Sequence, residues 1–82
     1  MALVDLTMVG RKKGGGTSVS ESVAIIQKVI DDSGLKNTLY PMSTVVEGDV
    51  EEIFDLVNAM RKALIDKGYT RIETSIRIQE DN

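Results

Sequence analysis

Residues 35–49 read LKNTLYPMSTVVEGD, and this stretch decides the fold. Its proline and its β-branched residues disfavour a helix and favour two short strands joined by a turn near residues 41–43. Proline cannot donate a hydrogen bond to a neighbouring strand, so the first of these strands is expected at an edge of the sheet. This strand pair lies in the middle of a chain of 82 residues, so the segments on either side of it must supply the rest of the fold.

A helical pattern flanks this strand pair on each side. The S-x-x-E spacing of residues 18–21 is that of a capping box, and an apolar stripe follows it to about residue 33. Asp49 and Glu52 repeat the capping pattern, and a second apolar stripe runs from there to residues 67–68. The sequence therefore predicts one helix before the strand pair and one after it.

The two ends of the chain alternate between apolar and polar residues, with the period of two that is typical of strands. Residues 2–9 and residues 72–78 show this pattern, whereas the final QEDN is expected to fray. The order β-α-β-β-α-β predicts a ferredoxin-like α+β sandwich, in which a four-stranded antiparallel sheet carries both helices on one face. Residues 1–82 are expected to form a single domain of this kind.

The other face of such a sheet is left without a covering layer. Its predicted residues mix charge with hydroxyl groups, which is too polar for a core: Asp5, Thr7, Glu73, Ser75 and Arg77. A domain of this size buries only about 60 to 65% of its unfolded surface, so it gains from self-association. We therefore expect a homodimer or homotetramer formed through the sheet.

Composition excludes several classes of function. Ten basic against thirteen acidic residues give a net charge of −3, which disfavours nucleic acid as a partner. Cysteine and histidine are both absent, so thiolate or imidazole metal sites and histidine-based acid/base catalysis are not expected. The short N-terminal apolar run soon meets charge, which predicts neither a signal peptide nor a membrane span and makes the cytoplasm the expected location.

Residues 10–21, GRKKGGGTSVSE, invite comparison with a phosphate-binding loop. A Walker A loop needs lysine directly after its last glycine, and Gly16 stands at that position. One alternative is that the amides of residues 16–18 bind an anion at the helix start. The other is a mobile, solvated connection, which the three consecutive glycines favour.

Two segments resemble the small thiamine-binding domain family. These are residues 16–20, GTSVS, and the more specific residues 41–49, PMSTVVEGD, and the similarity extends from the first predicted strand to the last. The resemblance implies a ferredoxin-like domain that associates as dimers and tetramers and binds thiamine or hydroxymethylpyrimidine. Two departures concern the turn, where Ser43 stands in place of a frequent glycine, and the longer, more basic first loop; the basic stretch beyond the last strand is also missing.

The implied ligand would need a carboxylate, small hydroxyl groups and a flat apolar wall. Residues of these types are expected on adjoining strands, and they make up the candidate ligand-binding set: Glu47, Thr44, Ser43, Thr7, Asp5, Ser75, Met42 and Tyr40. Each has a plainer interpretation. Glu47 is then a solvated strand-end carboxylate, Thr44 and Ser75 are ordinary strand residues, and Tyr40 and Met42 pack at the edge or against another subunit.

Catalysis is not expected, because no nucleophile and base pair can be assembled without histidine or cysteine. An acylphosphatase-like enzyme would need an arginine in a phosphate-binding loop, and the loop around Arg11 lacks that family's sequence. No cofactor and no metal are required by this interpretation; thiamine or hydroxymethylpyrimidine is the expected bound ligand. The alternative is a purely structural oligomer without a small-molecule ligand.

Overall fold

The computed structural model describes residues 1–14 and 20–82. Within these residues the chain forms strands and helices in the predicted order. They are β1 (Ala2–Arg11), α1 (Ser20–Asp32), β2 (Lys36–Leu39), β3 (Thr44–Gly48), α2 (Val50–Asp66) and β4 (Arg71–Glu80). The predicted helix cap at Ser18, and the predicted anion-binding amides of residues 16–18, lie outside the described residues.

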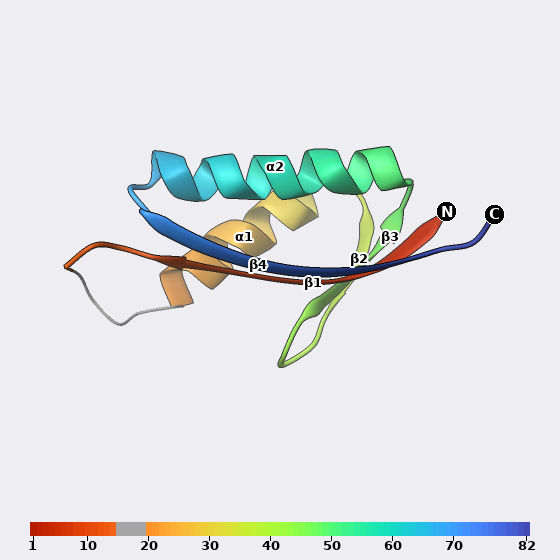
Figure 1. Cartoon of the computed structure of the whole chain (residues 1–82), viewed down its shortest axis with the longest axis horizontal. Helices are drawn as coiled ribbons and strands as arrows, with labels where there is room; N and C mark the ends of the chain where they lie inside the picture. The colour runs from red at the N-terminus through yellow and green to blue at the C-terminus, as the bar shows by residue number, and fades with distance from the viewer. Residues whose placement is uncertain (15–19) are drawn as a thin grey trace.

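The strands form one antiparallel sheet in the order β2-β3-β1-β4, and both helices lie on one side of it (Figure 1). Pairing of β1 with β4 runs without interruption from Ala2 opposite Glu80 to Arg11 opposite Arg71. This is the ferredoxin-like α+β fold that the sequence predicted. It places β2, which Pro41 follows closely, at an edge of the sheet, as expected from proline's missing N–H.

The core lies between the sheet and the helices, and the alternation in β1 selects its residues. Ala2, Val4, Leu6 and Met8 are buried, whereas Leu3 and Asp5 between them are exposed. Apolar residues at helical spacing on α2 close the core from the other side: Ile53, Leu56, Met60 and Leu64. Each large aliphatic side chain that is fully buried in this way contributes about 1.5 to 3 kcal/mol.

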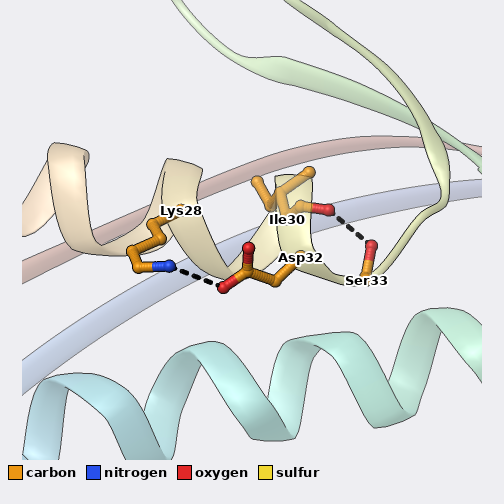
Figure 2. Close-up of polar contacts among 4 residues, drawn as sticks. All are labelled: Lys28, Ile30, Asp32 and Ser33. Atoms are coloured by element: carbon orange, nitrogen blue, oxygen red, sulfur yellow. Dashed lines mark hydrogen bonds and ion pairs between the residues drawn. The ribbon is translucent and has the colours of Figure 1, made fainter.

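Local contacts explain where α1 ends. The Ser33 hydroxyl donates to the Ile30 carbonyl (2.5 Å), and the Lys28 ammonium lies 2.9 Å from the Asp32 carboxylate (Figure 2). Gly34 then adopts a φ of +77°, a left-handed conformation in which glycine is favoured after a helix. The helix therefore stops at Asp32, one residue before the predicted end.

The start of α2 confirms the second predicted capping pattern. The Asp49 N–H donates to Glu52 Oε1 at 3.3 Å, which satisfies a backbone donor that the helix leaves without a partner. The first turn carries the acidic residues Glu51 and Glu52, whose charge suits the positive end of the helix dipole. The helix ends at Asp66, close to the predicted end at residues 67–68.

The prediction of a frayed QEDN tail is wrong for its first half. Gln79 and Glu80 belong to β4 and lie opposite Leu3 and Ala2, and the Asp81 N–H donates to the Met1 carbonyl at 3.5 Å. The reason is that β1 is ten residues long and offers a pairing partner along its whole length. The two ends of the chain consequently lie side by side (Figure 1).

The sheet face opposite the helices carries the predicted polar residues. Asp5 pairs with Arg77, Thr7 with Ser75, and Val9 with Glu73, all on the side of β1 away from its buried residues. No other element covers this sheet face within the described part of the chain.

The described helices are too short or too polar to cross a bilayer.

Candidate functional site

A hollow of about 220 Å³ lies between α1, the middle of β1 and the β2–β3 hairpin. Five residues of the predicted ligand-binding set contribute to its lining: Thr7, Tyr40, Met42, Ser43 and Thr44. The fold brings them together because Leu6 of β1 pairs with Thr44 of β3, so the hairpin turn projects next to Thr7. Figure 1 shows the hairpin tip extending beyond the rest of the sheet.

Backbone hydrogen bonds between Tyr40 and Ser43 close the hairpin turn. The Tyr40 N–H donates to the Ser43 carbonyl at 2.8 Å, and the Ser43 N–H donates to the Tyr40 carbonyl at 3.4 Å. Among the described residues only glycines have positive φ, so Ser43 adopts this turn without backbone strain. Serine in place of glycine is therefore compatible with the turn at this position.

A side-chain hydrogen bond ties the turn to the sheet. The Thr7 hydroxyl donates to the Met42 carbonyl at 3.2 Å. This bond links β1 to a turn residue that lies 35 positions later in the chain. Met42 itself is 85% exposed and Tyr40 is half-exposed, whereas Thr44 is only 8% exposed. The hollow thus has a buried hydroxyl at its base and exposed apolar side chains at its rim.

The rest of the lining is almost entirely apolar. Side chains from β1 and both helices form the inner wall: Leu6, Met8, Ile26, Ile30 and Met60. Gln27 of α1 adds the one amide of the described lining, and its Nε2 donates to Asp31 at 3.0 Å and to Asn37 at 3.2 Å. No charged side chain belongs to the lining in the described residues, so the hollow suits a neutral or weakly polar group.

The other three predicted residues, Asp5, Glu47 and Ser75, lie on the open sheet face. Asp5 contributes with Arg77 to a depression of about 240 Å³ there. The Glu47 carboxylate lies 3.4 Å from the Lys36 ammonium, and Ser75 pairs with Thr7. The predicted set is thus divided between the two sides of the sheet, and Glu47 and Thr44 do not share a pocket.

Gln27 and the apolar inner wall were not among the site residues predicted from the sequence. Gln27 follows Val23 by four positions, and that spacing places a polar residue beside the apolar stripe of α1. A polar residue so placed was a signal that this part of the helix offers a hydrogen-bonding group next to its apolar stripe. The apolar wall itself cannot be distinguished from ordinary core by sequence, because both use the same residue types.

A second polar cluster, made up of Lys12, Glu21 and Tyr69, lies at the N-terminal end of α1. The Lys12 ammonium lies 3.2 Å from the Glu21 carboxylate and 4.8 Å from the centre of the Tyr69 ring. The pKa of Glu21 is lowered mainly by a hydrogen bond from the Tyr69 hydroxyl and, to a lesser extent, by one from Lys12. Burial is the main cause that raises the pKa of Tyr69, and the hydrogen bond to Glu21 raises it further. This cluster holds the start of α1 against the end of β1.

The described residues contain no group of three or more acidic side chains able to hold a metal ion. Fold and hollow together define a ferredoxin-like domain with a small, uncharged pocket between helix and hairpin. The sequence matches the family described as "Thiamine-binding protein" over residues 4–82, and the chain belongs to this family. The resemblance of residues 16–20 and 41–49 is thereby confirmed.

Two bacterial relatives are similar over nearly the whole chain. A UPF0045 protein of Synechocystis is 41% identical over 75 residues, covering 92% of this chain and 60% of the relative. The UPF0045 protein YqgV of Bacillus subtilis is 35% identical over 85 residues, covering 98% of this chain and 80% of the relative. The chain therefore spans less than two thirds of the Synechocystis protein.

Solved structures agree with the fold. A Bacillus cereus domain of unknown function, DUF77, superimposes with a TM-score of 0.87 at 25% identity, over 98% of this chain and 75% of that one. A candidate thiamine biosynthesis or salvage protein from Thermotoga maritima superimposes with a TM-score of 0.83 at 25% identity, over 98% and 83% of the two chains. The ferredoxin-like architecture is thus shared with these proteins.

Proposed function

We propose that this protein binds thiamine or a related hydroxymethylpyrimidine compound without transforming it. The observation that carries the proposal is the convergence of Thr7, Tyr40, Met42, Ser43 and Thr44 on one hollow. Membership of the thiamine-binding family supports the class of ligand, and the family description names a ligand and no reaction. The composition agrees, because the chain has neither histidine nor cysteine to act as a nucleophile or as an imidazole base.

The chemistry of the hollow favours the pyrimidine half of such a ligand. An aminopyrimidine is neutral and offers ring nitrogens and an amine, which hydroxyl and amide side chains can pair with. Thr44, Ser43 and Gln27 supply groups of that kind, and the ring of Tyr40 supplies a flat rim. A thiazolium ring carries fixed positive charge, for which the described lining has no carboxylate.

The size of the hollow points in the same direction. Pockets for drug-sized ligands span about 300 to 1,000 Å³, and this hollow, at about 220 Å³, lies below that range. Hydroxymethylpyrimidine is smaller than thiamine and so fits the available space better. The high exposure of Met42 at the rim also supports a site near a subunit interface, where a second subunit would cover it.

Calorimetric titration with thiamine, hydroxymethylpyrimidine and thiamine phosphates tests this function. We expect hydroxymethylpyrimidine to bind the wild-type protein, and Thr44→Val to weaken binding by about tenfold through loss of one buried hydrogen bond. Glu47→Gln is the matched polar control, since Glu47 lies on the other sheet face and its substitution is expected to leave binding unchanged. The absence of heat with all of these compounds would contradict the proposed function.

The reverse result would relocate the site. If Glu47→Gln weakens binding and Thr44→Val does not, the ligand lies on the open sheet face with Asp5 and Ser75 rather than in the hollow. The competing function, a purely structural oligomer, is favoured by the exposed apolar residues Leu3 and Met42. It predicts self-association together with no calorimetric response to any of the compounds.

A further inference from the structure

A chain of hydrogen bonds fixes the side-chain amide of Gln27 at the edge of the hollow. Gln27 Nε2 donates to Asp31 Oδ1 at 3.0 Å and to Asn37 Oδ1 at 3.2 Å. Asn37 Nδ2 in turn donates to the Leu35 carbonyl at 3.1 Å. Gln27 belongs to α1 and Asn37 belongs to β2, so the network joins the helix to the edge strand.

These bonds allow only one orientation for each of the two amides. A carbonyl oxygen can only accept, so the Leu35 carbonyl requires the nitrogen of Asn37 and leaves the Asn37 oxygen for Gln27. The Asn37 oxygen and the Asp31 carboxylate are both acceptors, so both require the nitrogen of Gln27. Turning either amide over would bring two acceptors together. The two hydrogens of Gln27 Nε2 are therefore committed to these two partners.

The oxygen of Gln27 is the part of the amide that is left for the hollow. Gln27 belongs to the lining, whereas Asp31 and Asn37 do not, so the nitrogen is directed away from the hollow. The oxygen lies on the other side of the same carbon, and no described residue donates to it. Donation to a carboxylate also polarises the amide and makes its oxygen a stronger acceptor. The hollow thus has an unused acceptor with a fixed direction.

The other polar side chains of the described lining are hydroxyls, which do not have this fixed polarity. The Thr7 hydroxyl already donates to the Met42 carbonyl. The hydroxyls of Tyr40, Ser43 and Thr44 can rotate either to donate or to accept, as a ligand requires. Such groups bind an amine and an oxo group about equally well. Selection between the two therefore falls to Gln27.

We propose that Gln27 makes the hollow selective for a ring that carries an amine over the same ring with an oxo group in that place. This inference rests on the proposed function and names the residue that sets its specificity. The exocyclic amine of an aminopyrimidine donates to Gln27 Oε1, in the way that the amine of adenine donates to glutamine in DNA recognition. An oxo group at the same position would place two acceptors against each other.

The burial of Gln27 sets the size of the expected preference. A site that is built to hydrogen-bond its ligand rejects an analogue that leaves its polar groups without a partner. Gln27 is only partly buried, so water can still reach its oxygen and reduce the penalty. We therefore expect a preference of about tenfold for the amine.

Calorimetric titration of the wild-type protein separates this inference from the proposed function. The two compounds are hydroxymethylpyrimidine and its analogue in which an oxo group replaces the amine. Hydroxymethylpyrimidine is expected to bind about tenfold more tightly. Equal affinities, or tighter binding of the oxo analogue, would overturn the inference and leave the proposed function standing. If neither compound binds, the proposed function is contradicted and the inference falls with it.

Gln27→Met tests whether this residue causes the preference, because methionine has a similar length and no strong acceptor. Hydroxymethylpyrimidine should bind about tenfold more weakly to this variant, and the oxo analogue should bind as it does to the wild type. Lys28→Met is the matched control, since Lys28 is the next residue of α1, is exposed and lies outside the lining. It should keep the wild-type preference. A preference that survives in Gln27→Met would overturn the assignment.

Removing both partners of Gln27 tests its fixed orientation. In the double variant Asp31→Ala, Asn37→Ala the amide can turn, so that either its oxygen or its nitrogen faces the ligand. The oxo analogue should then gain affinity while hydroxymethylpyrimidine keeps most of its own, and the preference should fall although Gln27 is present. A network with a merely structural role would weaken both compounds equally. That result, or an undiminished preference, would contradict the proposal.

Discussion

At Gly10 the backbone of β1 passes directly beneath the ring of Tyr69. A methyl group at this position would lie 2.8 Å from Tyr69 Cδ1, closer than side chains tolerate, and 3.2 Å from Leu64 Cδ1, a tight contact that a small shift of the leucine would have to relieve. The φ of Gly10 is not positive, so glycine is needed there for space and not for backbone conformation. The residue lets the α2–β4 connection fold tightly onto the end of β1.

Gly10→Ala is therefore expected to lower the free energy of unfolding by about 1 to 3 kcal/mol, through overpacking of a closed contact. Urea denaturation monitored by circular dichroism measures the effect. In a Tyr69→Ala background the same substitution should have a clearly smaller effect, because the clashing ring is gone. An equal effect in both backgrounds would show that the ring is not the cause.

The Glu21 carboxylate makes stability depend on pH. Its pKa is lowered in the folded protein by the hydrogen bond from Tyr69 and by Lys12, so its contribution is present above the ordinary value of 4.5 and is lost as the pH falls through the lowered pKa. Glu21→Gln should be less stable than wild type at pH 7, and the difference should shrink by pH 3. A difference that stays constant between these pH values would contradict this assignment.

Among the elements, the β2–β3 hairpin has a turn that is tied to the sheet by a side-chain hydrogen bond. The Thr7 hydroxyl, which donates to the Met42 carbonyl, is the contact that joins the turn to the central strand. Thr7→Val is expected to lower stability by about 0.5 to 1.5 kcal/mol, the usual worth of one such hydrogen bond. Amide exchange at Ser43 should accelerate more than exchange at Val46.

Thr38→Val is the matched control for this prediction. Thr38 lies on β2 of the same hairpin, is exposed, and pairs with Val45, one residue pair removed from the turn. Its substitution should leave amide exchange at Ser43 unchanged. Comparable acceleration by both substitutions would mean that the Thr7 hydroxyl does not position the turn.

The elements themselves were predictable because each carried a local signal. Alternation identified β1 and β4, capping residues identified the start of α2, and Pro41 placed β2 at the edge. The division of the candidate site between the two sheet faces could also be partly predicted from the sequence. Thr44 and Glu47 are three residues apart in one strand, so their side chains must point to opposite faces. The register between β1 and β3 could not be predicted from the sequence, because the pairing of Leu6 with Thr44 follows from packing of the whole sheet.

On the scale of the whole molecule, an association of two chains should be visible in thermal unfolding. If the folded chains pair and the unfolded chains do not, raising the protein concentration raises the melting temperature by mass action. We expect this dependence for the wild type, in line with the homodimer or homotetramer predicted from the sequence. A melting temperature that is independent of concentration in the wild type would argue for a monomer.

The pairing of Ala2 with Glu80 also has a consequence for synthesis on the ribosome. β1 is made first, yet the strand that completes one of its two sides is made last, so most of the chain must emerge before this central strand is enclosed. Until then its outer backbone groups and its alternating apolar side chains are open to other nascent chains. Protection of β1 during translation therefore falls to whatever shields newly made polypeptides.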